Sequence, residues 1–122
     1  MDKKTLLLCT VGGSPEPLVA SIKHWRPNRI VFVPSKETKS EINEKIMPVL
    51  AAENVSIDPG CYDSIVVDDS QNFSLCLRTM HRKLDEKVEE WLSKGPDFQV
   101  VVDFTGGTKC MTAALALVAQ RW

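Results

Sequence analysis

The sequence predicts an α/β protein in which a parallel β-sheet is covered by helices on both faces. Four runs of β-forming residues alternate with four stretches that have the pattern of helices. The first and the last of these runs are almost entirely apolar, as expected for strands that are covered on both sides. A pair of glycines follows each of those two runs, at the end of the sheet where parallel α/β proteins bind ligands.

The first strand and the first helix are joined by a short glycine turn. Residues 5–11 form an apolar, β-capable run that ends at Gly-Gly-Ser-Pro, residues 12–15. Ser14 suits the N-cap of a helix and Pro15 suits its first position. We expect this helix to end at about Trp25.

The second unit begins with an apolar run at residues 29–34. Thr38 and Glu41 have the spacing of a capping box, so a helix is expected to begin there. Pro48 lies inside the helix and should kink or shorten it. The apolar face of this helix comprises Ile42, Ile46, Val49 and Leu50.

The last two units contain the clearest helical pattern. The third strand is expected within residues 55–67, where Pro59 interrupts the run. A helix then follows, stopped by Gly-Pro at residues 95–96. Residues 98–104 are expected to form the fourth strand, and Thr108 the start of the last helix. The apolar residues of the clearest helix are Phe73, Leu77, Met80, Leu84, Val88 and Trp91, at helical spacing.

Composition indicates one globular domain of 122 residues. A net charge of −1 argues against broad binding to duplex nucleic acid, so no DNA binding by this domain is expected. No signal peptide and no membrane span are expected either, because no apolar run approaches ~20 residues. The four cysteines lie far apart, so we expect no metal site, no disulfide and no cofactor, and a location in the reducing cytoplasm.

The turn after the fourth strand is a candidate anion site. Residues 105–109, Thr-Gly-Gly-Thr-Lys, lead directly into a helix. The free N–H groups and the dipole at a helix start attract an anion, and the glycines let a phosphate approach the main chain. Thr105 and Thr108 add hydroxyl groups and Lys109 adds a positive charge. The sequence therefore predicts a site for a phosphorylated ligand.

The first loop can complete this site. If the first and fourth strands are neighbours, Gly12 and Gly13 converge with Gly106 and Gly107 on one pocket. Neither loop has the G-x-G-x-x-G pattern of a dinucleotide site or the Walker A pattern of a P-loop. The alternative for each loop is a tight connection that holds no ligand.

Two further pairs of side chains have plainer explanations. Cys9 and Cys110 flank the glycine loops, and packing as small apolar groups is preferred over nucleophilic chemistry. Arg78 and Arg82 lie four residues apart on a helix, where they could contact phosphate. A solvated helix face is the preferred interpretation of these two arginines.

The two loops resemble motifs of a known family. Residues 103–111, Asp-Phe-Thr-Gly-Gly-Thr-Lys-Cys-Met, resemble the D-x-T-G-G-T-K-x-M signature of CARF domains, the CRISPR-associated Rossmann-fold sensors. Residues 10–17 resemble the first loop of these domains, and the order of elements is similar over almost the whole chain. The resemblance implies a Rossmann-like fold.

The resemblance also implies a ligand and a partner. CARF domains of type III CRISPR systems bind cyclic oligoadenylates as homodimers, so the ring, here expected to be cyclic tetra-adenylate, would lie across two copies of each loop. Met111 would pack beneath an adenine or at the dimer seam. The ligand-binding residues implied by position are Gly12, Gly13, Ser14, Pro15, Ser35, Thr38, Thr105, Gly106, Gly107, Thr108, Lys109 and Met111.

Two alternative functions remain open at this point. Some CARF domains cleave their own ligand without a metal, and the catalytic candidates would then be Ser14, which would position the attack, and Lys109, which would stabilise the developing charge. The other alternative is a generic nucleotide-binding regulatory domain.

The last helix raises the question of what covers it. Residues 113–119 are all apolar, and such a helix needs cover on every side, either from a dimer partner or from further residues. CARF domains usually continue with further strands and an effector domain. Residues 1–122 are therefore expected to be a single CARF-like ligand-binding domain truncated after its fourth helix, with any effector activity outside it.

Overall fold

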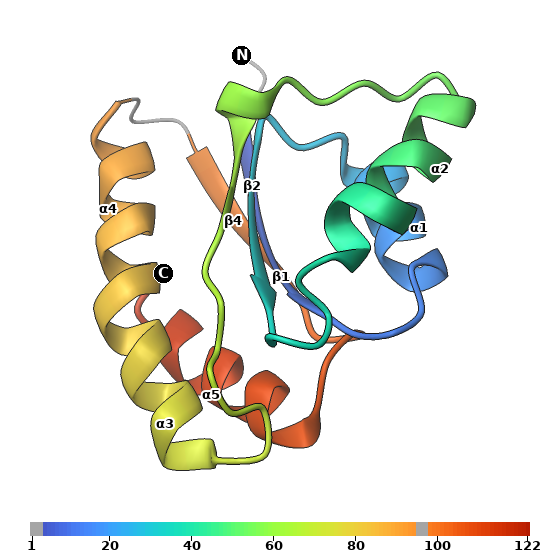
Figure 1. The fold of residues 1–122 in the computed structure, drawn as a ribbon. Helices are drawn as coiled ribbons and strands as arrows, with labels where there is room; N and C mark the ends of the chain where they lie inside the picture. The colour runs from blue at the N-terminus through green and yellow to red at the C-terminus, as the bar shows by residue number, and fades with distance from the viewer. Residues whose placement is uncertain (1–3, 95–97) are drawn as a thin grey trace.

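The computed structural model describes residues 4–94 and 98–122, which are built around one parallel sheet (Figure 1). The strand order is β3-β2-β1-β4, and every neighbouring pair is parallel. This arrangement confirms the predicted α/β, Rossmann-like fold. The strands are β1 (Lys4–Val11), β2 (Arg29–Pro34), β3 (Tyr62–Ser64) and β4 (Phe98–Asp103).

Helices cover both faces of the sheet, as the alternating pattern predicts (Figure 1). One face carries α1 and α2, and the other carries the run from α3 to α4 together with α5. The helical elements are α1 (Glu16–Trp25), η1 (Ile42–Ile46), α2 (Met47–Ala52), η2 (Pro59–Cys61), α3 (Phe73–Thr79), η3 (Met80–Leu84), α4 (Asp85–Ser93) and α5 (Lys109–Ala119).

Strand β1 lies at the centre of the hydrophobic core. Its residues alternate between the two faces: Leu6 and Leu8 pack with α3–α5, whereas Leu7 and Cys9 pack with α1 and α2. All four are 0% exposed. The long apolar run that predicted this strand therefore reflects cover on both sides.

Strand β3 is much shorter than the range in which it was expected. Pro59 begins a 3-10 turn, η2, so the strand starts only at Tyr62. Pairing with β2 continues irregularly beyond the strand, because the backbone N–H of Val67 donates to the carbonyl of Pro34 at 2.8 Å. The chain thus reaches the carboxyl edge of the sheet at Ser35 and Val67, which form an isolated parallel bridge.

The second helix begins differently from the prediction. The capping box is wrong, because the helical run begins at Glu41 and has no side-chain cap. The segment before Pro48 is a π-helix, η1, which adapts the backbone to a residue that lacks an N–H group. Val49, expected on the buried face, is 40% exposed.

The long helix after β3 is confirmed as one continuous helical run over α3, η3 and α4. Its central segment, Met80–Leu84, is a π-helix. Phe73, the first residue of the predicted apolar face, is 37% exposed, because it lies at the open end of the helix. The stop predicted at residues 95–96 lies outside the described residues.

No helix within the described ranges is long and apolar enough to cross a membrane.

Helix α1 starts one residue later than predicted: Pro15, not Ser14, is its N-cap, and no side chain caps it. The carbonyl of Pro15 accepts the first helical bond, from the N–H of Val19 at 2.9 Å.

Candidate functional site

The two glycine loops meet at the carboxyl edge of the sheet. Strands β1 and β4 are direct neighbours in register, with Cys9 opposite Asp103. Strand β4 ends at Asp103, whereas β1 continues to Val11. The hydroxyl of Thr10, near the end of β1, donates to the carbonyl of Gly106 in the second loop. The two strands are therefore neighbours, as the prediction required, and the two loops lie in contact at one edge of the sheet.

Glycine is required where the two main chains touch. A Cβ atom at Gly106 would lie 2.5 Å from the carbonyl oxygen of Thr10 and 2.9 Å from the nitrogen of Gly12. A Cβ atom at Gly12 would lie 2.7 Å from the nitrogen of Gly107. These clashes involve backbone atoms, which cannot rotate away. The loops are thus interlocked by close main-chain contact.

The second loop is shaped by Asp103. Its carboxylate accepts the backbone N–H of Thr105 at 2.8 Å and the hydroxyl of the same residue at 2.5 Å. This is the local turn that an aspartate two residues before a threonine typically forms. The turn directs the chain back over the end of β1, where Gly107 takes a left-handed conformation, with φ of 84°.

Thr108 connects the loop to α5 and to a further loop. Its hydroxyl accepts the N–H of Met111 at 3.2 Å, which makes it the N-cap of α5. The same hydroxyl donates to the carbonyl of Ser70, in the loop between β3 and α3. The start of α5, with its free N–H groups and positive dipole end, is therefore held at the rim of the site.

A third loop, after β2, supports the first. The hydroxyl of Thr38 donates to the carbonyl of Val11 at 2.9 Å and accepts the N–H of Ser35 at 2.9 Å. Ser35 is only 4% exposed. These two predicted ligand residues lie beside the site, but their hydrogen-bonding groups hold the end of β1 in place.

The remaining predicted residues divide into exposed and buried groups. Met111 is 1% exposed and packs beneath Gly107. It therefore supports the turn from below. The residues of the two loops that are exposed at the surface are Gly13, Ser14, Thr105, Gly107 and Lys109.

The two catalytic candidates, Ser14 and Lys109, lie on opposite loops of the site and are both exposed. Within residues 4–94 and 98–122, Lys109 forms no ion pair. Its charge is therefore available to an incoming anion.

Of the two cysteines expected beside the loops, Cys9 is fully buried and Cys110 is partly buried against the core; Cys76, on α3, is also buried. Burial, and to a smaller extent the nearby Asp103 carboxylate, raise the pKa of the Cys9 thiol well above its ordinary value. Burial likewise raises the pKa of Cys76. Both thiols stay protonated at neutral pH and are poor nucleophiles, as expected for Cys9.

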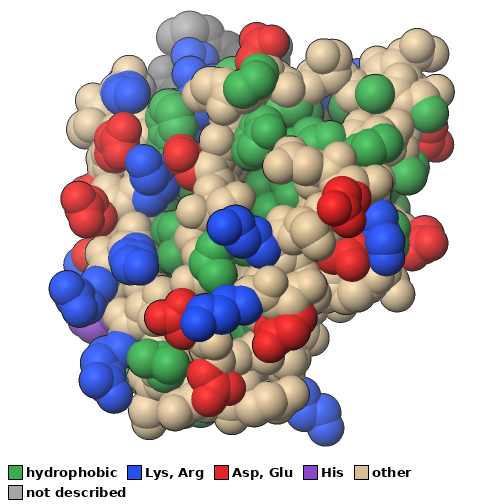
Figure 2. Space-filling model, in the orientation of Figure 1, with side chains coloured by type: hydrophobic (Ala, Val, Ile, Leu, Met, Phe, Trp, Pro, Cys, Tyr) green, Lys and Arg blue, Asp and Glu red, His purple; other side chains and the backbone are tan. Residues whose placement is uncertain are grey.

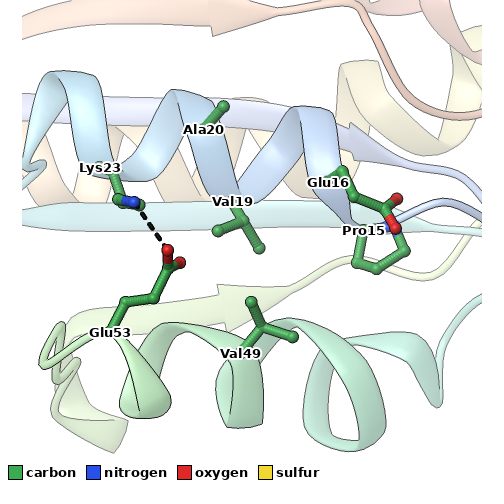
Figure 3. A pocket seen from close by; sticks show the side chains of 7 residues that line it. All are labelled: Pro15, Glu16, Val19, Ala20, Lys23, Val49 and Glu53. Carbon is green, nitrogen blue, oxygen red and sulfur yellow. Dashed lines mark hydrogen bonds and ion pairs between the residues drawn. The ribbon is translucent and has the colours of Figure 1, made fainter.

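A separate cavity of about 370 Å³ lies between α1 and α2 and reaches Pro15 of the first loop (Figure 3). Val19 and Val49 approach each other across it, and an ion pair between Lys23 and Glu53, at 2.9 Å, closes the end away from Pro15. No residue of the second loop lines this cavity. This cavity is therefore distinct from the place where the two glycine loops meet.

Three residues that organise the site were not predicted. Asp103 had a sequence signal, since it stands two residues before Thr105. Thr10 belongs to the segment that resembles the first CARF loop, but its bond to Gly106 was not predicted. This bond and the one from Thr108 to Ser70 depend on which strands and loops become neighbours in the folded chain.

Solved structures with the same architecture include three large proteins. Csm6 from Enterococcus italicus, bound to cyclic hexa-2'-fluoro-hexa-dAMP, aligns with a TM-score of 0.69 and 15% identity over 99% of this chain. Can2 from Sulfobacillus thermosulfidooxidans, in complex with cyclic tetra-adenylate, aligns with a TM-score of 0.65 and 17% identity over 96%. Protein VC1899 from Vibrio cholerae aligns with a TM-score of 0.67 and 16% identity over 96%.

The chain has the fold of these proteins. This agrees with the fold implied by the resemblance to CARF domains. The chain spans only 31%, 29% and 28% of the length of Csm6, Can2 and VC1899, respectively. No protein-family model and no curated protein sequence matches it.

Proposed function

We propose that this domain is a sensor of cyclic oligoadenylate, with cyclic tetra-adenylate as its ligand. The observation that carries the proposal is the interlocked pair of glycine loops at the start of α5. This geometry offers backbone N–H groups at the start of α5 and the Lys109 ammonium group to a phosphate. Two of the three structures with this fold hold cyclic adenine oligonucleotides, which supports the choice of ligand.

The proposed sensor acts as a homodimer within a type III CRISPR antiviral effector in the cytoplasm. A ring of identical nucleotides has the symmetry to contact the same loops of two protomers. The outer side of α5 offers an apolar surface for the second copy, because Leu117 is 55% exposed there. Phe104, at the start of the second loop, is a second exposed apolar side chain, at 45%.

Ligand-induced thermal stabilisation tests the proposal. The chain is heated with cyclic tetra-adenylate, cyclic hexa-adenylate, linear tetra-adenylate or AMP, each at several concentrations. A ligand at 100 times its Kd stabilises the folded state by ~2.7 kcal/mol. We expect the largest shift with cyclic tetra-adenylate. Equal shifts with AMP would instead indicate a generic nucleotide-binding domain.

The variant Lys109→Ala locates the site. Loss of one charge-assisted contact, worth ~1.5–3 kcal/mol, should raise the Kd about 10- to 100-fold. Lys94→Ala is the control, because it removes the same charge at the end of α4, beside Trp91 and away from both loops. A Lys109→Ala variant that binds as tightly as Lys94→Ala would contradict the proposed pocket.

A further inference from the structure

A second concave surface lies on α3, apart from the two glycine loops. It is a groove of about 210 Å³ that runs from the loop after β3 along α3 into the π-helical segment η3. Figure 2 shows Lys and Arg side chains gathering on the side of the molecule formed by α3 and α4. The side chains that line the groove are Asp68, Leu75, Arg78, Thr79, Arg82 and Lys83.

The groove carries positive charge that the rest of the described chain does not neutralise. Arg78, Arg82 and Lys83 are exposed, and none of them forms an ion pair with a residue in the ranges 4–94 and 98–122. The acidic residue of the lining, Asp68, lies 3.9 Å from the ammonium group of Lys36. Like charges four residues apart weaken a helix, so helix stability does not account for the two arginines.

The three cations of the groove come from two consecutive helical segments. Arg78 lies in α3, and Arg82 lies over it, four positions along the helix. Arg82 and Lys83 lie in the π-helical segment η3, and both line the groove with Arg78. Such π-helical segments inside α-helices occur frequently at functional sites.

We propose that this groove binds the sugar–phosphate backbone of single-stranded nucleic acid. Arg78, Arg82 and Lys83 would each contact a phosphate, and the planar guanidinium groups match two phosphate oxygens at once. Leu75 is the one apolar side chain of the described lining, and it is half-buried, so the groove offers little to the apolar anchors by which peptides bind. This site shares no residue with the glycine loops, and it does not depend on the function proposed for them.

Fluorescence anisotropy with a labelled ten-nucleotide oligouridylate tests this inference. Oligouridylate is chosen because it lacks the adenines proposed to bind at the glycine loops. Three phosphate contacts predict that log K falls with log salt with a slope of about −2. We expect the variant R78A/R82A/K83A to bind at least tenfold more weakly and with a slope near zero.

The variant K23A/K45A/K94A is the matched control, since it removes three positive charges from exposed positions outside the groove. It should keep the wild-type affinity and slope. Equal weakening of the two variants would mean that net charge alone is responsible, and the inference would be wrong. It would also be wrong if the wild-type chain did not bind the oligouridylate, or if millimolar inorganic phosphate or polyglutamate displaced it completely.

Discussion

Gly13 differs from its neighbours in the space around its α-carbon. A Cβ atom there would meet nothing within 4 Å, whereas one at Gly106 would lie 2.5 Å from the carbonyl oxygen of Thr10. Gly13 is also exposed at the surface of the site. The free protein therefore has no steric need for glycine at position 13, so a side chain there would project into the space where we propose that the ligand binds.

The pair Gly13→Val and Gly106→Ala separates ligand contact from folding. We expect Gly13→Val to unfold at the wild-type temperature but to lose most of its stabilisation by cyclic tetra-adenylate, because the side chain occupies the ligand's space. Gly106→Ala should destabilise the free protein by about 1–3 kcal/mol through overpacking. Thermal unfolding with and without ligand measures both. Wild-type ligand stabilisation in Gly13→Val would argue against a ligand above the first loop.

Single residues of the site were predictable where their role depends on local sequence. Thr108 and Lys109 lie at the start of α5 as expected, because the strand–turn–helix pattern fixes their place. Ser14 is not the N-cap of α1, and Met111 lies beneath the turn. The N-cap of α1 differs from the prediction by one residue, which is a local shift. The position of Met111 depends on packing against Gly107, which sequence spacing alone does not specify.

Helix α5 depends on one side chain at its start. We expect Thr108→Val to lower the free energy of unfolding by about 1–2 kcal/mol, because it removes both the cap to the Met111 N–H and the bond to the Ser70 carbonyl. Thr112→Val is the control, since that hydroxyl only donates to a carbonyl of its own helix, at 3.1 Å. Urea titration of the two variants measures the difference. Equal stability of the two variants would show that the tie to Ser70 and the cap contribute nothing.

The secondary structure elements were predictable in kind but not in detail. Apolar periodicity predicted the helical run from Phe73 because its buried face is continuous through Trp91. The π-helical segments η1 and η3 have no comparable signal in the sequence. A π-helical turn is only about one residue longer than an α-helical turn, so the spacing of apolar residues hardly changes. Strand β3 is short because residues 59–61, which lie within the range where a strand was expected, form the 3-10 turn η2 instead.

On the scale of the whole molecule, α5 is the element that the chain leaves partly uncovered. On its inner side Met111, Leu115 and Val118 are buried, but Leu117 on the outer side is 55% exposed. The sheet also ends at β4, where Val100 and Val102 are only partly buried. The partly uncovered α5 was expected, because residues 113–119 are apolar nearly all round. The partial burial of β4 was not expected: its apolar run predicted a strand covered on both sides, but β4 is the edge strand of the sheet.

Leu117→Lys tests whether this surface joins two protomers. We expect the variant to be monomeric in light scattering after size-exclusion chromatography and to bind cyclic tetra-adenylate more weakly, because a charge would be buried without a partner. The control is Val49→Lys, which places the same charge at an exposed apolar residue between α1 and α2. A wild-type mass for Leu117→Lys, or a monomeric wild-type chain in the presence of ligand, would contradict the proposed dimer.

The contact between the two glycine loops also bears on how such a domain can diverge. Gly12, Gly106 and the Thr10 carbonyl occupy the same small volume, so a larger residue at one position cannot be accepted while the others stay as they are. The two loops are 90 residues or more apart along the chain, yet a substitution in one of them requires a compensating change in the other. Exposed positions such as Gly13 and Thr105 are free of this constraint, and changes of ligand preference would arise there first.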